Sequence, residues 1–181
     1  MDIYLASGNR NKQREISEIL SSHRILLPAD IGVAYEADET GPTFLDNALI
    51  KARALYTLIQ KPVLADDSGL VVPALGGEPG VYSARYGSKE TGRELPGTER
   101  NALLLERMRG ITERAGFFVC CMVLYLSDVR FFIVQETLEG VIALEPRGTG
   151  GFGYDPIVYL PPYQKTVAEL DPEEKNRISH R

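Results

Sequence analysis

A helix pattern that leads through a proline into a short apolar strand is the feature that most constrains the fold of this chain. Residues 43–59 carry apolar side chains at helical spacing, on Phe44, Ala48, Leu55 and Ile59. Thr43 is typical of a helix N-cap, and Asp46 stands where the acid of a capping box stands. Pro62 limits the helix, and the apolar residues 63–65 start a buried strand. A helix that is followed at once by a buried strand favours an α/β fold.

Similar patterns predict three more helices. One extends from about residue 13 to residue 20, with its apolar side chains on one face. Another covers residues 98–109, begins at a cap formed by Thr98 and ends before a glycine. Near the C-terminus, Asp171 is followed by Pro172, as an N-cap is followed by a proline at the first helical position.

Strands are predicted at the N-terminus and in the second half of the chain. Residues 3–6 form a short apolar strand. Residues 117–126 and 130–136 indicate two strands joined by a tight turn, which makes a hairpin. Residues 140–144 predict a further strand, and residues 157–160 follow a glycine-rich loop in extended form. Helices that alternate with strands early, and a hairpin later, indicate an α/β fold with a mixed sheet.

Size and charge restrict the class of protein. A chain of 181 residues, of which 44% are hydrophobic, is expected to form a single domain, with room for two lobes. The 20 basic and 25 acidic residues leave a formal charge of −5. That balance argues against general binding to nucleic acid or to a membrane, but it allows a local basic pocket for one anionic ligand. Neither a signal peptide nor an apolar stretch of transmembrane length is found.

The only cysteines, Cys120 and Cys121, are neighbours inside an apolar run. Adjacent residues of a strand point to opposite faces of the sheet, so neither a disulfide nor a shared metal site is expected from this pair. We expect two buried thiols, which fits a cytoplasmic location.

The segment SGNRNK, residues 7–12, follows the first strand and is a candidate anion site. At a junction of strand, small-residue turn and helix, backbone N–H groups and the helix dipole both favour negative charge. Lys12 adds a cation in the first helical turn. A positive charge there is unfavourable for the helix itself, so a bound anion would explain why a lysine stands at this position. The alternative is a plain junction with a solvated lysine. The hexapeptide matches neither a Walker loop nor a dinucleotide-binding loop.

Acidic residues precede the long predicted helix. Glu36, Asp38 and Glu39 either interact with the helix dipole as a cluster or belong to a solvated loop. Lys51 lies one turn beyond Asn47, and it either points toward the same end of the sheet or is a surface lysine.

ADDSGL, residues 65–70, places two carboxylates directly after an apolar strand. Neighbouring acids repel each other there unless a cation, a proton or a solvated turn relieves them. If the strand persists, Asp66 and Asp67 point in opposite directions, so one of them can face a ligand. Mg²⁺ takes one or two carboxylates besides water and phosphate oxygens, and Glu39 with one of this pair would supply them. The alternative is an Asx turn.

Two segments near the C-terminus complete the candidate features. In GTGGFGYDP, Phe152 lies between glycines and either offers its ring to a flat heterocycle or packs into the core. The last segment, EKNRISHR, contains Lys175, His180 and Arg181. Arginine and neutral histidine hydrogen-bond acceptors on a purine edge, whereas the alternative is a charged helix end.

Taken in order, these segments resemble the inosine triphosphate pyrophosphatase family, whose members hydrolyse ITP, dITP and XTP to the monophosphate and pyrophosphate and so cleanse the nucleotide pool. The matching stretches are SGNRNK, ETGPTFLDNALIKA, ADDSGL with GGEPGVYSARYG, GTGGFGYDPI, and KTVAELDPEEKNRISHR. They span nearly the whole chain, and five ordered motifs are far more specific than any one of them.

The resemblance implies a role for each motif in the reaction. The triphosphate would be cradled by Ser7, Gly8, Asn9, Arg10, Asn11 and Lys12. Mg²⁺ would be held by Glu39 and Asp67, with Asp66 in a second role at the metal. Asp67 would accept the proton of the attacking water, and Lys12 would assist at the phosphate. Further substrate contacts would come from Lys51, Ser68 and Lys175.

The same resemblance implies that the last two motifs bind the purine ring of the nucleotide. Phe152 would stack on the purine, and the wall beside it would be completed by Gly153, Tyr154 and Asp155. His180 and Arg181 would read the 6-oxo group. The implied fold is one domain over residues 1–181, with two lobes around a long, mixed, twisted sheet flanked by helices and a nucleotide cleft between the lobes. The implied partners are a nucleotide substrate and a second copy of the chain.

The chain departs from the family pattern at two single positions and, to a larger extent, at its C-terminus. The family often has threonine at the position of Ser7 and glutamate at the position of Asp46, so that a hydroxyl and a carboxylate are kept. The family also usually continues with a further helix after the SHR of residues 179–181.

Overall fold

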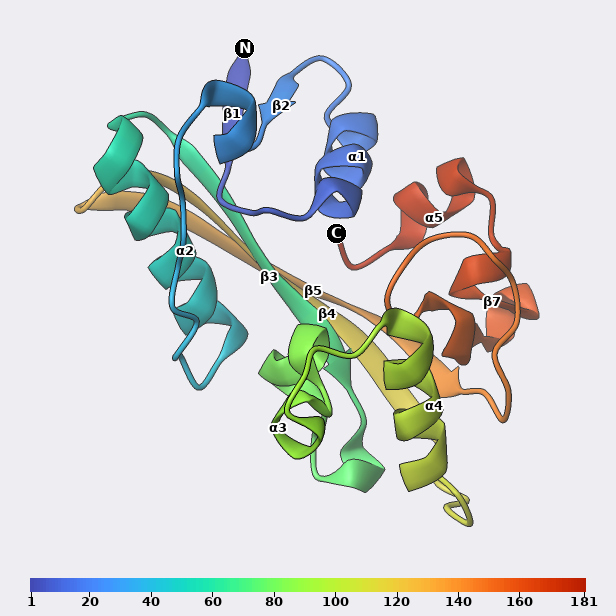
Figure 1. Ribbon diagram of the computed structural model, residues 1–181. Coiled ribbons are helices and arrows are strands. Elements are labelled where there is room, and N and C mark those ends of the chain that lie inside the picture. Colours follow the sequence, from blue (N-terminus) through green and yellow to red (C-terminus); the bar gives the residue numbers. More distant parts are fainter. The chain divides into compact units, whose positions relative to one another are not determined.

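The computed structural model describes residues 1–181, which form one seven-stranded mixed sheet with five α-helices (Figure 1). The strand order is β2-β1-β3-β4-β5-β6-β7. β1 is parallel to β2 and β3, whereas β6 is antiparallel to β5 and β7. The strands are β1 Asp2–Leu5, β2 Arg24–Leu26, β3 Val63–Val71, β4 Ala115–Ser127, β5 Arg130–Ile142, β6 Val158–Leu160 and β7 Lys165–Thr166. The α/β fold with a mixed sheet is as predicted.

The helices are α1 Arg10–Ile19, α2 Phe44–Ile59, α3 Ser88–Thr91, α4 Gly97–Arg107 and α5 Pro172–Ile178. The hydroxyl of Thr43 accepts from the N–H of Asp46 and caps α2, as predicted. The carboxylate of Asp171 likewise accepts from the N–H of Glu174 and caps α5. Two side-chain caps that the sequence indicates therefore fix where these helices begin.

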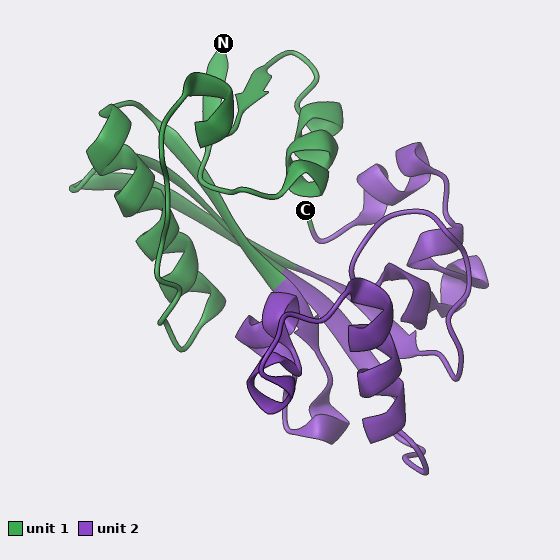
Figure 2. Ribbon diagram, viewed as in Figure 1, with its two compact units in different colours: residues 1–68, 120–136, 181 green, residues 69–119, 137–180 purple.

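The chain divides into two compact units (Figure 2). Unit 1 comprises Met1–Ser68, Cys120–Glu136 and Arg181, and unit 2 comprises Gly69–Val119 and Thr137–His180. β3 and β4 each contribute residues to both units, and so does β5.

Unit 1 has two apolar clusters. One lies under α2, where the buried face of the helix packs with β3 and β4 through Ala48, Ala52, Leu55, Ala65, Val123 and Tyr125. The other includes Ile16 of α1 with side chains of β1, β2 and β3. Both helices are thus held to the sheet by their apolar faces, which fixes the direction in which their polar residues point.

Unit 2 has one core cluster, which joins β3 and β4 residues to the glycine-rich loop. Its buried members include Leu70, Leu104, Met108, Phe118, Tyr154, Ile157 and Leu160. The hydroxyl of Tyr154 donates to the carbonyl of Ser83 at 2.9 Å, so that this loop is anchored in the core by an aromatic side chain.

Several predicted elements have different bounds in the structure. β3 starts at residue 63 and continues through both aspartates, so of the two alternatives the persisting strand is right and the Asx turn is wrong. Residues 140–144 do not form a strand of their own, because β5 runs on to Ile142. Thr98 lies inside α4, whose N-cap is Pro96. The short strands β2 and β7 have no counterpart in the prediction.

The prediction of two buried thiols is confirmed, since Cys120 and Cys121 are both buried and free. No helix is both long enough and apolar enough to cross a membrane.

Candidate active site

The first group of predicted residues surrounds Asp66, a carboxylate of β3 with no exposed surface. Lys12 Nζ donates to Asp66 Oδ1 at 2.6 Å, and Arg181 Nε donates to Asp66 Oδ2 at 2.6 Å. The guanidinium of Arg181 also donates to Glu15 Oε2 at 2.6 Å and to Ser68 Oγ at 2.9 Å. One buried acid is therefore held by two cations from opposite ends of the chain.

The charge state of Asp66 follows from these neighbours. Its burial alone would raise the pKa of the carboxyl, but Lys12 and Arg181 lower it, and the net result is a pKa well below the ordinary value. Asp66 is thus a carboxylate at neutral pH. The thiol of Cys120 contacts Asp66 Oδ2 at 3.5 Å, and burial raises the pKa of this thiol, which stays protonated.

Asp67, the next residue of β3, meets a different set of groups. Lys51 Nζ donates to Asp67 Oδ1 at 2.6 Å and to the carbonyl of Asp66 at 2.8 Å. Glu39 Oε1 lies 3.5 Å from the same ammonium. Lys51 reaches these groups because it projects from the buried face of α2, one turn after Asn47. The predicted lysine therefore points toward the acids and is not a surface residue.

The free oxygen of Asp67 is the unusual feature of this cluster. Asp67 Oδ2 is buried and has no hydrogen-bond partner. Burial raises the pKa of the Asp67 carboxyl above its ordinary value, although Lys51 opposes the shift. The two neighbouring acids thus differ: Asp66 is fully paired, whereas Asp67 keeps one oxygen for another group.

The acids around Lys51 fit a magnesium ion that is bound mainly through phosphate and water oxygens. No group of three or more His, Cys, Asp or Glu side chains could hold a metal. Mg²⁺ needs only one or two carboxylates when water and phosphate oxygens complete its shell. Asp67 Oδ2 lacks a partner, and Glu39 approaches the same ammonium as Asp67 does. Both oxygens of Asp66 already accept from cations, so the geometry favours Glu39 and Asp67 as ligands.

The SGNRNK turn ends in a capped helix. Asn9 caps α1, with its side-chain oxygen accepting from the N–H groups of Asn11 and Lys12. Ser7 Oγ accepts from the N–H of Asn9, and Arg10 forms an ion pair with Asp30 in the connection from β2 to α2. No acidic residue neutralises the first turn of α1. A Cβ added at Gly8 would meet nothing within 4 Å, so the turn is open at this point.

The second group of predicted residues lies in unit 2. Asp155 Oδ2 accepts from Lys175 Nζ and from the N–H of Phe152, both at 2.7 Å. Lys175 Nζ also lies 5.1 Å from the centre of the Phe152 ring. A Cβ added at Gly151 would meet Asp155 Oδ2 at 2.0 Å, so this position requires glycine. The loop is therefore folded tightly around one buried ion pair.

His180 belongs to the same unit and stacks on Phe118. The two ring centres are 4.8 Å apart and the planes are inclined by 9°. Asn101 of α4 donates to the carbonyl of Gly153 at 3.1 Å and holds the loop from the other side.

The structure thus brings the predicted residues together in two groups. Those of unit 1 are Ser7 to Lys12, Glu39, Lys51, Asp66, Asp67, Ser68 and Arg181, and those of unit 2 are Phe152 to Asp155, Lys175 and His180. Sequence reasoning missed Glu15 and Asn101. The signal for Glu15 was an acid directly before the buried Ile16, but its partner lies 166 positions away.

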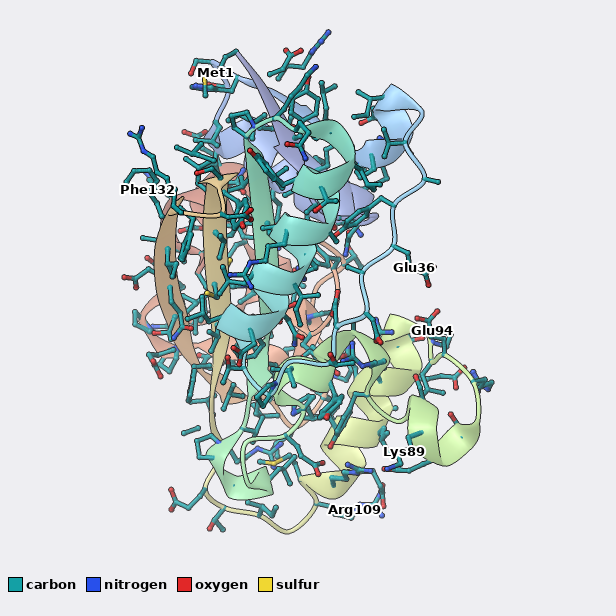
Figure 3. All side chains as sticks on the ribbon, turned by 90° about the vertical axis from the view of Figure 1, so that its left-hand side faces the viewer. Met1, Glu36, Lys89, Glu94, Arg109 and Phe132 are labelled. Carbon is teal, nitrogen blue, oxygen red and sulfur yellow. The ribbon has the colours of Figure 1, made fainter.

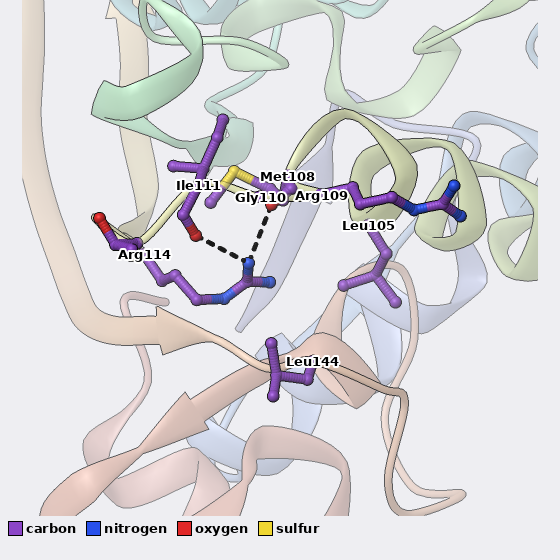
Figure 4. A pocket seen from close by; sticks show the side chains of 8 residues that line it. Leu105, Met108, Arg109, Gly110, Ile111, Arg114 and Leu144 are labelled. Atoms are coloured by element: carbon purple, nitrogen blue, oxygen red, sulfur yellow. Dashed lines mark hydrogen bonds between the residues drawn. The ribbon is translucent and has the colours of Figure 1, made fainter.

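None of the predicted residues lines the cavity of about 430 Å³ in unit 2 (Figure 4). Its walls come from the end of α4, the segment that follows it and Leu144. Arg114 donates there to the carbonyls of Met108 and Ile111, so its guanidinium is used to hold the turn.

Known proteins match this chain over its length. A sequence model of the Ham1 family matches residues 3–181. A Treponema denticola protein named dITP/XTP pyrophosphatase is 53% identical over 181 residues, which are 100% of this chain and 93% of that protein. A protein of that name from Thermus thermophilus is 49% identical over 100% of this chain and 86% of that protein. The solved structure of a HAM1 protein from Coxiella burnetii is 42% identical, with a TM-score of 0.87 over 100% of this chain and 92% of that chain.

Proposed function

Because this chain belongs to the Ham1 family, we propose that it hydrolyses non-standard purine nucleoside triphosphates such as dITP, XTP and ITP to the monophosphate and pyrophosphate. The observation that carries the proposal is Asp67, a buried carboxylate whose Oδ1 pairs with Lys51 and whose Oδ2 has no partner. A carboxylate with a raised pKa and a free acceptor atom is suited to take a proton from water.

We assign the binding of the substrate's phosphate groups to the lysines of unit 1. Lys12 and Lys51 both approach the acids of β3, and the N-terminus of α1 adds its dipole. A triphosphate would compete with Asp66 and Asp67 for these ammonium groups. The open turn at Gly8 allows an anion to come close to the backbone.

In the reaction, the oxygen of a water molecule bonds to the α-phosphorus while the bond from that phosphorus to the bridging oxygen breaks. Asp67 accepts the proton that the water loses, and pyrophosphate leaves. Lys12 and Lys51 neutralise charge on the phosphate oxygens. Mg²⁺ held by Glu39 and Asp67 would add Lewis-acid stabilisation and make the water more acidic.

We assign the purine ring of the substrate to unit 2. The ring of Phe152 offers a face for stacking, and hydrogen bonds of Tyr154 and Asp155 hold the loop behind it. Inosine and xanthosine carry an acceptor at the 6-position, where adenosine carries a donor. His180 of this unit supplies a donor for such an acceptor, so adenine would leave polar groups unpaired.

The proposed activity is tested by measuring pyrophosphate release from dITP, XTP, GTP and ATP, with and without Mg²⁺. We expect release from dITP and XTP, far slower release from GTP and ATP, and little release once the metal is chelated. Binding of dITP without turnover would show instead a nucleotide-binding protein. We place the activity in the cytoplasm, in line with the two free thiols.

Phe152→Ala should raise the KM for dITP by about tenfold, because stacking of a base on an aromatic ring contributes roughly 1–3 kcal/mol. The matched control is Phe152→Tyr, which keeps an aromatic face and should keep the KM near that of the wild type. An unchanged KM for the alanine variant, measured by steady-state pyrophosphate release, would remove Phe152 from the base site.

A further inference from the structure

One lysine contacts both of the acids that the proposed function assigns to Mg²⁺. Lys51 Nζ lies 2.6 Å from Asp67 Oδ1 and 3.5 Å from Glu39 Oε1. It also donates to the carbonyl of Asp66 at 2.8 Å. All of these residues belong to unit 1. A cation of the protein itself therefore neutralises the two acids when no nucleotide is bound.

Burial keeps this ammonium at the acids. The side chains of Lys51 and Asp67 are only 7% and 8% exposed. A buried ammonium that loses its carboxylate is costly unless another anion takes its place. The stem of a lysine is flexible and its three N–H donors rotate, so the ammonium of Lys51 can turn to a new anion while α2 stays on the sheet.

The positive charge of Lys51 opposes a metal ion at the same acids. Asp67 Oδ2 has no partner and could contact a metal, but Oδ1 of the same carboxylate already accepts from the ammonium. Two cations at one buried carboxylate repel each other, and little water is present to screen them. A triphosphate changes this balance, because its oxygens both bind Mg²⁺ and accept from lysine.

A second lysine shows where the ammonium of Lys51 would turn. Lys12 Nζ donates to the carbonyl of Asp66 at 3.2 Å, and Lys51 Nζ donates to the same oxygen. Two ammonium groups that share one carbonyl oxygen are close neighbours and repel each other. A phosphate group that accepted from both lysines would relieve this repulsion.

We propose that Lys51 is the counter-ion of Glu39 and Asp67 in the nucleotide-free protein and thereby makes metal binding depend on the nucleotide. The free protein binds divalent cations weakly. The triphosphate draws the ammonium of Lys51 to its own oxygens, and the two acids then hold the metal. The metal site is thus completed only when a substrate is present. The inference rests on the proposed function, which supplies the triphosphate and the metal ligands, and it adds an order of binding.

The test measures the Kd of Mn²⁺ for the nucleotide-free chain, by electron paramagnetic resonance of the unbound ion at pH 8.5. Mn²⁺ prefers the same oxygen ligands as Mg²⁺. Lys51→Met keeps the length of the side chain and removes its charge, so it should bind Mn²⁺ at least about tenfold more tightly than the wild type. The reason is that a neighbouring positive charge weakens the affinity of a carboxylate for a proton by roughly ten- to a thousandfold, and a divalent ion is repelled more strongly.

Two further variants show where the ion binds. Lys89→Met removes an exposed lysine of α3 and should leave the Kd of Mn²⁺ unchanged (Figure 3). Glu39→Gln, added to Lys51→Met, should remove most of the gain in affinity, because Glu39 is then unable to hold the ion. Circular dichroism spectra that match the wild type would show that these variants are folded.

The wild type alone gives an independent measurement. A dITP analogue with a methylene group in place of the α–β bridging oxygen cannot be cleaved at this bond. Relaxation of water protons by Mn²⁺ should show the ion held by the wild type together with this analogue, and hardly held without it. By linkage, the metal should tighten the binding of the analogue by the same factor.

Two results would overturn the proposal. One is a wild type that binds Mn²⁺ as tightly without the analogue as with it. The other is a folded Lys51→Met whose Kd for Mn²⁺ equals that of the wild type. Failure of the proposed function looks different, since the wild type would then release no pyrophosphate from dITP and Mg²⁺, whatever its affinity for Mn²⁺.

Discussion

Asp67→Asn is expected to lower the rate of pyrophosphate release from dITP by about a hundred- to ten-thousandfold, the range that general base catalysis contributes. The asparagine side chain has the same size, and its oxygen still accepts from Lys51, so the local geometry persists. What is lost is the ability to take a proton, together with one charge that would hold Mg²⁺. The variant should therefore fold and bind nucleotide but fail in the chemical step.

The dependence of the rate on pH gives a second readout of the same residue. Burial raises the pKa of Asp67 above the ordinary value for aspartate. A base works only when it is deprotonated, so the rate of the wild type should fall as the pH drops through this raised pKa. The residual rate of Asp67→Asn should lack that acid limb. Measurements of kcat at saturating dITP between acid and alkaline pH would show the difference.

Asp38→Asn is the matched control, because Asp38 is exposed, lies next to Glu39 and undergoes the same chemical change. Its turnover should equal that of the wild type. If Asp67→Asn retained near wild-type turnover while Asp38→Asn behaved as expected, Asp67 would not be the base, and the assignment of the attacking water would have to move elsewhere.

The parts of the fold that the sequence predicted are those specified locally. Thr43 and Asp171 cap their helices through hydrogen bonds that span three residues, so the signal lies within one short segment. The apolar face of α2 repeats every three or four residues and determines which side packs on the sheet. The same helical repeat predicts that Lys51, four residues after Asn47, lies on the same face of α2.

The parts that the sequence did not predict depend on distant partners. β3 continues through two acids because Asp66 finds Lys12 at a separation of 54 positions and Arg181 at a separation of 115. A local pattern cannot supply these counter-charges, so the sequence left open whether the strand persists or an Asx turn follows. The prediction divided β5 into residues 130–136 and 140–144, whereas β5 is continuous in the structure and Gly140 allows β6 to approach closely.

The pair of acids shows how neighbouring side chains in one strand acquire different properties. Successive side chains of β3 point to opposite faces, so Asp66 and Asp67 meet different elements. Asp66 meets α1 and the C-terminal residue, which bring two cations, whereas Asp67 meets α2, which brings one. The first carboxyl therefore has a lowered pKa and the second a raised one. Because successive side chains of β3 alternate between the two faces of the sheet, one of two adjacent acids forms structural ion pairs while the other keeps a free oxygen for reaction.

Asp66→Asn should lower the free energy of unfolding at pH 7 by about 3–5 kcal/mol, because it leaves two buried cations without their shared counter-charge. The side chain of Asp66 has no exposed surface and that of Arg181 has 2%, so solvent cannot compensate. Urea denaturation followed by circular dichroism would measure the change. Asp2→Asn is the control, since it removes the acid of the exposed pair with Arg24 and should have little effect.

The pH dependence of this loss follows from the direction of the pKa shift. The folded state holds the pKa of Asp66 well below its ordinary value near 3.8, so the carboxylate stabilises the fold fully above that value. The contribution is lost as the pH falls through the lowered pKa. The difference between wild type and Asp66→Asn should therefore be constant from neutral pH down to about pH 5 and shrink only in stronger acid. A variant as stable as the wild type at pH 7 would show that Lys12 and Arg181 do not depend on this carboxylate.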